Sequence, residues 1–263
     1  MNLLLIEPDE IAPDRRVRLA GRRARHLVRV LRVAPGRVLR AGVLGGGLGG
    51  AEVLAVFGEA GRRAETEAAS EEAVELRLDA CDGPPPPPPA DLILALPRPK
   101  ALRRILRLVA AVGVRRLDLV NAWRVERSYF ASPVLEPEAI RRELALGAEQ
   151  GGVPRLPAVE VRRFFVPFVE DLEREPARPR IVAHPGADAT LEEALKDSAG
   201  VPPALAVGPE GGWIEAELES FRGAGFRPAS LGPWTLTTEH AVAAALGQLA
   251  LLDRRRDRFS ATP

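Results

Sequence analysis

Apolar and polar positions follow different patterns in the two halves of the chain. Before residue 80, apolar residues at every second position, as at 74, 76 and 78, predict short β-strands. Apolar residues at 24, 27, 28 and 31 have helical spacing and predict one amphipathic helix. The glycine-rich stretch around residues 41–50 predicts a hairpin turn between strands at 38–39 and 51–57. Residues 1–80 therefore predict a small β-rich domain with one helix.

After residue 90, short apolar runs alternate with helical patterns. This alternation predicts an α/β domain with a mostly parallel sheet, in which ligands bind at the carboxyl ends of the strands. The predicted strands are 91–96, 117–120, 181–183 and 204–207, and the predicted helices are 100–112, 137–150, 191–196, 214–221 and a last apolar helix opened by 237–239.

Six consecutive prolines, Pro84–Pro89, separate the two patterns. Such a run adopts extended polyproline II structure and predicts a semi-rigid linker. The predicted organisation is a domain at 1–80, a linker at 81–90 and a second domain at 91–263.

Two glycine-containing turns in the second half indicate a ligand site. Gly208–Gly212 (GPEGG) stands between a predicted strand and a predicted helix, and Leu231-Gly232-Pro233 precedes the last helix. Such turns present free backbone N–H groups and let a ligand approach the main chain. The sequence contains neither a Walker A loop nor a G-x-G-x-x-G motif at this turn. The pattern favours a nucleotide-like ligand, with a purely structural turn as the alternative.

Composition excludes several classes of protein. The chain has 263 residues, of which 46% are apolar and 28% charged, and its net charge of +1 gives no polyelectrolyte character. One cysteine excludes an internal disulfide framework, and three histidines without ligand spacing predict no metal site. Because no signal peptide or membrane-length apolar run is recognisable, we expect a soluble cytoplasmic protein without a membrane partner.

Arginines dominate the basic residues and gather on the first predicted helix. Arg22, Arg25, Arg29 and Arg32 fall on the side opposite its apolar positions, which is typical of a surface that binds a nucleic-acid backbone. Arg98 and Lys100, beyond the linker, would extend this surface. The alternative is a solvated helix in an arginine-rich chain.

Several short motifs occur in an order that resembles a known family. They are His26…Arg29-Val30-Leu31-Arg32…Pro35-Gly36, Glu126-Arg127-Ser128, Ala148-Glu149-Gln150, His184-Pro185, Gly208–Gly212, Leu231-Gly232-Pro233 and Leu236-x-Thr238-Glu239. This order resembles the ribosomal RNA small subunit methyltransferase E family, the 16S rRNA uracil-N3 methyltransferases. The resemblance implies a PUA-like N-terminal β-barrel that binds RNA and a C-terminal SPOUT domain with a trefoil knot. It also implies a homodimer that acts on 16S rRNA or the 30S subunit.

The resemblance further implies S-adenosylmethionine as the cofactor, held by three loops. In this sequence those loops supply Ala183, His184, Gly208, Pro209, Glu210, Gly211, Gly212, Leu231, Gly232, Leu236 and Thr238. Methylation of uracil N3 requires loss of an imide proton and stabilisation of the resulting charge. The candidates for these roles are Glu239 and Arg127. Their alternatives are a carboxylate that stabilises the first turn of a helix and an arginine that binds RNA phosphate or lies at the surface.

The chain departs from the family at positions where the family carries arginine. Val153, Trp234 and Thr237 stand there instead. Trp234 either stacks on a base or fills the space that an arginine would occupy. The alternative function is therefore a diverged relative that acts as an RNA-binding or ribosome-assembly module, or that methylates another RNA acceptor.

Overall fold

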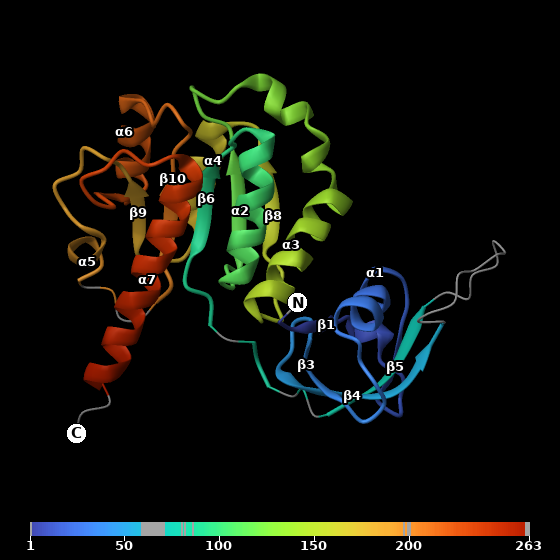
Figure 1. Cartoon of the computed structure of the whole chain (residues 1–263). Coiled ribbons are helices and arrows are strands. Elements are labelled where there is room, and N and C mark those ends of the chain that lie inside the picture. The colour runs from blue at the N-terminus through green and yellow to red at the C-terminus, as the bar shows by residue number, and fades with distance from the viewer. Residues whose placement is uncertain are drawn as a thin grey trace. The chain divides into compact units, whose positions relative to one another are not determined.

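The computed structural model describes residues 2–58, 72–79, 81, 83–85, 87–196, 198 and 201–260. The chain divides into two compact units (Figure 1). The first comprises Met1–Pro86 with Ala148–Arg155, and the second comprises Pro87–Gly147 with Leu156–Pro263. The boundary at Pro86–Pro87 falls inside the predicted linker, of which residues 82 and 86 lie outside the described residues. Residues 148–155, predicted to belong to the second domain, are part of the first unit.

The first unit is built on a five-stranded sheet with the strand order β1-β3-β4-β5-β2. β1 and β3 are parallel, and the other pairs are antiparallel. Buried Leu19, Leu27, Val53 and Leu76 form part of its core. Its elements are β1 (Leu4–Ile6), a 3-10 turn (Pro8–Glu10), β2 (Arg16–Leu19), α1 (Gly21–Arg25), a π-helical turn (His26–Val30), β3 (Val38–Val43), β4 (Leu48–Phe57) and β5 (Ala73–Leu78).

The predicted hairpin is present, but its turn is shorter than the glycine pattern suggested. β3 and β4 pair from Val38↔Glu52 to Gly42↔Leu48, so Gly42 and Gly50 lie within strands. A Cβ atom at Gly42 would lie 3.0 Å from Pro154, and one at Gly50 would lie 2.5 Å from Asp79 Oδ2. These glycines allow close packing and do not form the turn.

The arginine-rich helix of the first unit is short. Ala24, Leu27 and Val28 are buried, which confirms the apolar side of the predicted helix. α1 has only five residues before the π-helical turn, and Arg32, just beyond it, has a positive φ of 48°. The change of helical period and the left-handed residue therefore end the helix.

The second unit confirms the α/β prediction. Its six strands are all parallel, in the order β11-β9-β10-β6-β7-β8. Figure 1 shows α2 and α7 across one face of the sheet, with α4 and α6 on the other. The strands are β6 (Asp91–Ala95), β7 (Arg116–Val120), β8 (Ala158–Arg162), β9 (Arg180–Ala183), β10 (Ala204–Val207) and β11 (Arg227–Ala229). The helices are α2 (Pro99–Ala111), α3 (Pro137–Gly151, whose residues from 148 on belong to the first unit), α4 (Phe165–Arg174), α5 (Leu191–Ala194), α6 (Glu215–Gly223) and α7 (Thr238–Ser260), with 3-10 turns at Arg127–Ala131 and Pro133–Leu135.

Three elements of this unit had not been predicted. β8 and β11 are the two edge strands of the sheet. β8 carries Glu160 and Arg162, and β11 has only three residues, one of them Pro228. Prolines and charges are tolerated at sheet edges, where they weaken the apolar signal. α4 contains Pro167 in its first turn. A proline is compatible with a helix at this position, but it interrupts the sequence pattern from which a helix is predicted.

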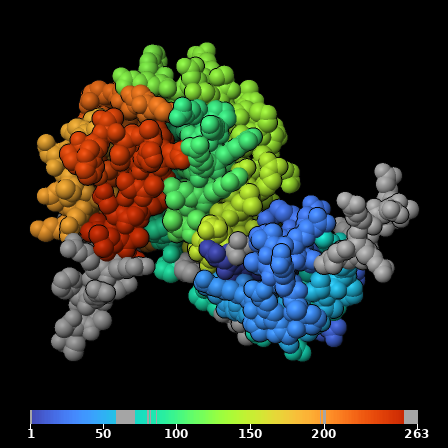
Figure 2. All heavy atoms as spheres, in the orientation of Figure 1, coloured from blue at the N-terminus to red at the C-terminus, as the bar shows by residue number. Residues whose placement is uncertain are grey.

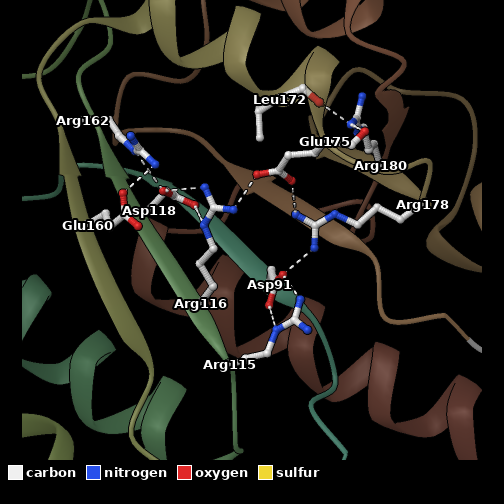
Figure 3. A network of polar contacts seen from close by, with 10 residues as sticks. All are labelled: Asp91, Arg115, Arg116, Asp118, Glu160, Arg162, Leu172, Glu175, Arg178 and Arg180. Carbon is white, nitrogen blue, oxygen red and sulfur yellow. Dashed lines mark hydrogen bonds and ion pairs between the residues drawn. The ribbon is translucent and has the colours of Figure 1, made fainter.

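A network of ion pairs joins the start of β6, β7 and β9 to the end of α4 (Figure 3). Asp91 is buried and accepts hydrogen bonds from Arg115 (2.7 Å) and Arg178. Glu175 connects this group to β7, because it accepts from Arg178 (2.9 Å) and from Arg116 (2.5 Å). The network also includes Asp118, Glu160, Arg162 and Arg180.

Candidate functional site

Three loops at the carboxyl ends of β9, β10 and β11 line one pocket of the second unit. Because these strands are parallel neighbours, their following loops emerge at the same edge of the sheet. All eleven residues predicted for the cofactor loops line this pocket: Ala183, His184, Gly208, Pro209, Glu210, Gly211, Gly212, Leu231, Gly232, Leu236 and Thr238.

The turn after β10 gives the pocket a wall of main chain. Gly212 has a φ of +74°, and its amide donates to the Pro209 carbonyl (2.8 Å). A Cβ atom at Gly208 would lie 3.1 Å from Nε1 of Trp213, so a side chain there would crowd the indole ring. Among the described residues, the amides of Glu210 and Gly211 have no hydrogen-bond partner. These two donors are available to a polar ligand atom.

Two side chains of α7 contact two of the loops. Thr238 Oγ1 donates to the Gly208 carbonyl (3.3 Å), and Gln248 Nε2 donates to the Leu231 carbonyl (2.9 Å). Thr237, one of the positions where the family carries arginine, accepts a hydrogen bond from the His240 amide (3.4 Å) and so caps the helix. The third loop is thus fixed by α7 and by its bond to the second loop.

Sequence reasoning missed six further residues of the pocket. They are Pro185, Val207, Trp213, Trp234, Thr235 and Ala241. All six lie within or next to the predicted loops, so their positions in the chain indicated that they are near the pocket. The sequence did not indicate which of their side chains point into it.

The two tryptophans of the pocket differ in burial. Trp213 is 5% exposed and packs edge-on against Phe221, with ring centroids 5.0 Å apart. Trp234 is 71% exposed and lines the pocket, so its ring lies at the rim. Stacking on a base and filling the space of an arginine both stay predictions for this residue.

The two predicted catalytic residues are not among the residues that line the pocket. Glu239 lies in the first turn of α7 and pairs with Arg104 of α2, with 3.2 Å between Oε2 and Nη1. The space-filling view shows α7 (red) packed against α2 (green) along this side (Figure 2). Arg127 is exposed on the 3-10 turn that follows β7, and no carboxylate among the described residues pairs with it. Among the described residues, no ion pair or hydrogen bond joins Glu239 to Arg127.

The predicted RNA-binding arginines are exposed but differ in their partners. Arg22 donates to both oxygens of Glu149 (2.8 and 3.0 Å), and Arg29 donates to Glu72 (2.7 Å). Arg25 and Arg32 pair with no carboxylate among the described residues. In the second unit, Arg98 Nε lies 3.9 Å from Glu210, and Lys100 is exposed in the first turn of α2.

Glu149, which belongs to the motif at 148–150, has a structural role in the first unit. Its side chain is 4% exposed and lies against Arg22 of the same unit. Its backbone carbonyl accepts from the amides of Asn2 and Leu3, both at 3.0 Å. A buried carboxylate of this kind needs its cationic partner, so the motif at 148–150 contributes to the structure of the first unit.

The described residues show no metal cluster and no membrane-spanning helix. No group of three or more His, Cys, Asp or Glu side chains is arranged to hold a metal ion within the described residues. In the same part of the chain, no helix combines the length and apolar character needed to cross a bilayer.

Comparisons with known proteins place the chain among RNA methyltransferases. Residues 84–250 match the model of the RNA methyltransferase domain family. The ribosomal RNA small subunit methyltransferase E of Treponema pallidum is 30% identical, over 93% of this chain and 89% of that protein. The Mycobacterium bovis protein of the same name is 29% identical, over 88% and 85% of the two chains.

Solved structures share the fold over nearly the whole length. A ribosomal RNA small subunit methyltransferase E from Neisseria gonorrhoeae, bound to S-adenosyl methionine, has a TM-score of 0.68 at 22% identity and covers 96% of this chain and 98% of that one. A probable rRNA-methyltransferase from Porphyromonas gingivalis has a TM-score of 0.71 at 22% identity, with coverage of 96% and 99%.

Proposed function

The chain belongs to the RNA methyltransferase family, as a member of its ribosomal RNA small subunit methyltransferase E branch, and from this premise we propose that it methylates N3 of a uridine in 16S rRNA. The cofactor is S-adenosylmethionine. The observation that carries the proposal is the pocket at the ends of β9, β10 and β11, which gathers all eleven residues of the predicted cofactor loops.

The residues of the pocket fit this cofactor. The free amides of Glu210 and Gly211 would donate to its polar groups, and apolar Leu231 and Leu236 would flank the adenine. Glycine at 208 leaves room beside the Trp213 ring. When bound, the cofactor supplies an electrophilic sulfonium methyl group, which leaves with cleavage of the S–C bond as the N3–C bond forms.

The acceptor nitrogen must lose its proton before or during methyl transfer. We propose that Glu239 accepts this proton as a general base and that Arg127 stabilises the negative charge on the uracil oxygen, in line with the family motifs. Since Arg104 holds Glu239 in the free protein, Glu239 would exchange this partner for the nucleotide. Catalytic hydrogen bonds often form only in the substrate complex.

The finer features of the fold belong to the same proposal. The strand order β11-β9-β10-β6 requires the chain to cross between β9, β10 and β11 out of sequence order, and the Thr190↔Ser230 bridge joins two of the crossing segments. These features support a trefoil knot of the SPOUT type in the second unit. The five-stranded sheet with its short helix supports a PUA-like first unit that binds RNA through Arg22, Arg25, Arg29 and Arg32.

We also propose a cytoplasmic homodimer that meets 16S rRNA or the 30S subunit. α7 supports the dimer, because it exposes the small residues Ala243, Gly247 and Ala250 and leaves Leu251 58% exposed. Arginine in place of Gly247 should shift the mass measured by sedimentation from dimer to monomer, whereas arginine in place of exposed Glu219 on α6 should not.

The experiment that tests the function combines titration calorimetry with methyl transfer. The protein should bind S-adenosylmethionine and transfer its methyl group to N3 of a uridine in 30S subunits that lack the modification. Glu239→Gln should keep cofactor affinity and lower the transfer rate about 100-fold or more. Cofactor binding without transfer to any 16S uridine would reject the proposed acceptor, and absence of cofactor binding would reject the assignment of the pocket.

A further inference from the structure

Two of the most exposed aromatic side chains lie in the segments that follow β7 and β8. Trp123 is 80% exposed and Phe164 is 73% exposed. Each stands beside an arginine in the chain, Arg124 and Arg163. We call these four residues the aromatic–arginine surface. Large apolar side chains exposed together commonly mark an interaction site.

Hydrogen bonds between the ends of β7 and β8 bring the two segments together. The Asn121 amide donates to the Arg162 carbonyl (2.9 Å), and Asn121 Nδ2 donates to the Arg163 carbonyl (3.2 Å). Trp123 follows Asn121 by two residues, and Phe164 follows Arg163 directly. The two aromatic residues therefore extend from neighbouring strand ends of one sheet.

α6 fixes both segments from the same side. The Trp123 backbone amide donates to Glu217 Oε1 (2.7 Å), and Glu217 is itself buried. The ring of Phe165 packs edge-on against Phe221, one turn further along α6, with centroids 5.3 Å apart. Because Phe165 turns toward this helix, Phe164 faces the solvent. The exposure of Trp123 and Phe164 thus results from an ordered backbone.

No carboxylate among the described residues neutralises the two arginines of this surface, so their charge is available to a binding partner. Arg124 donates to the Gly211 carbonyl, and Arg163 stacks 5.4 Å above the ring of Phe130. Neither pairs with a carboxylate among the described residues, in contrast to Arg104 and Arg107 of the same unit. Aromatic faces beside unpaired arginines match single-stranded nucleic acid, in which bases stack and phosphates pair with cations.

A second copy of the chain is a poorer match for the same surface. A two-fold interface contains the same patch from both copies, so it would gather Arg124 and Arg163 of both subunits without a carboxylate in the patch to pair with them. The surface is also connected to the pocket, because Gly211, which accepts from Arg124, is one of the pocket-lining residues. A strand of RNA with one nucleotide at the pocket would reach the aromatic–arginine surface with its neighbours.

We propose that the aromatic–arginine surface binds a single-stranded segment of RNA next to the target nucleotide, with bases stacked on Trp123 and Phe164 and phosphates paired with Arg124 and Arg163. This inference rests on the proposed function, since it supplies the path of the RNA that the pocket would modify. It concerns residues outside the three cofactor loops.

The test compares RNA and cofactor affinity in the full-length protein. Trp123→Ala and Phe164→Ala should each raise the Kd for a single-stranded 16S rRNA oligonucleotide about 5- to 100-fold. Trp123→Phe should retain most of the affinity, because it keeps a stacking face. The Kd for S-adenosylmethionine should be unchanged in all three. Val201→Ala, which alters an exposed apolar residue elsewhere in the unit, serves as the control.

Two results would overturn the inference and leave the proposed function standing. One is unchanged RNA affinity in both alanine variants while the wild type binds RNA and cofactor. The other is a shift from dimer to monomer that accounts for the lost RNA affinity, which would make the surface an interface between copies. Failure of the wild type to bind RNA would overturn this inference together with the proposed acceptor.

Discussion

Trp213 shows how a single side chain supports the pocket. Its ring packs against both Phe165 and Phe221, with centroids 6.1 and 5.0 Å away, and lies against Gly208. Its Nε1 atom is buried and has no hydrogen-bond partner among the described residues. The ring therefore stabilises the turn by packing, while the N–H group contributes no hydrogen bond to it.

This division of roles predicts a small effect for one substitution at Trp213 and a large one for another. Trp213→Phe keeps the aromatic packing and removes an unsatisfied donor, so the free energy of unfolding should change by less than about 1 kcal/mol. Trp213→Ala should lower it by about 3–5 kcal/mol, because it leaves a cavity beneath the turn. Chemical denaturation of both variants measures the difference. Equal losses would show that the indole nitrogen has a partner in solution.

At the scale of elements, α2 and α3 meet at a glycine. A Cβ atom at Gly147 would lie 2.1 Å from the backbone carbonyl oxygen of Arg107, so no side chain fits without moving one helix. Arg107 also donates from Nε to the buried Glu143 (2.6 Å), one turn before Gly147. The sequence pattern showed two helices but not that their backbones touch here.

Alanine substitutions at two helical glycines should have opposite effects. Gly147→Ala should destabilise the protein by at least about 1–3 kcal/mol, because the added carbon would overlap with main chain that cannot rotate away. At Gly223, in the last turn of α6, a Cβ atom would meet nothing within 4 Å, so Gly223→Ala should be neutral or slightly stabilising. Thermal unfolding of the two variants checks this. A stable Gly147→Ala protein would contradict the close approach.

The ion-pair network predicts a dependence of stability on pH. Burial raises the pKa of Asp91, but hydrogen bonds from Arg115 and Arg178 outweigh it and lower the pKa below its ordinary value. The pKa of Glu175 is also lowered, since Arg116 and Arg178 outweigh the effect of burial. Asp118 differs, because burial dominates and raises its pKa despite Arg116 and Arg162.

The lowered pKa values of Asp91 and Glu175 determine whether acid raises or lowers the stability of the fold. A carboxyl with a lowered folded pKa contributes stability above its unfolded pKa, near pH 4, and loses it as the pH falls through the folded value. Asp118 works in the opposite direction, since its contribution is complete below its unfolded pKa and is lost as the pH rises. Denaturation of wild type and Asp91→Asn between pH 3 and 7 should show a smaller acid loss in the variant. Equal slopes would exclude Asp91 as a source of that loss.

At the scale of the whole molecule, a net charge of +1 gives little long-range attraction to RNA. Binding would depend on local arginines that lack a carboxylate partner. The first unit offers a matched pair: Arg25 has no such partner among the described residues, and Arg29 donates to Glu72 at 2.7 Å.

Salt titration of RNA binding separates the two arginines. For Arg25→Ala, the slope of log K against log salt should fall by about 0.7 for a single-stranded contact. Arg29→Ala should change the slope less, because its charge is partly neutralised by Glu72. The same slope in both variants and the wild type would show that this helix does not contact the RNA backbone.

Much of the second unit was determined by local sequence. The strands at 91–95, 180–183 and 204–207 contain short apolar runs that end at turn residues, and the residues of the first two cofactor loops follow the last two of these strands directly. Local pattern carries this information because parallel buried strands and glycine turns have strong compositional requirements. The family motifs added the order of the loops, which spacing alone did not provide.

Tertiary structure alone decided what depends on contacts between distant residues. The edge strand β11 lacks an apolar pattern and exists because it pairs with β9. Glu149 became a buried partner of Arg22, 127 positions away in the chain. The exposure of Trp123 and Trp234 depends on which neighbouring side chains turn toward the core. The amino-acid sequence does not specify these side-chain directions. Sequence determined most of the elements and the loops that line the pocket. Packing determined the edge strands and decided which side chains face the pocket and which face the solvent.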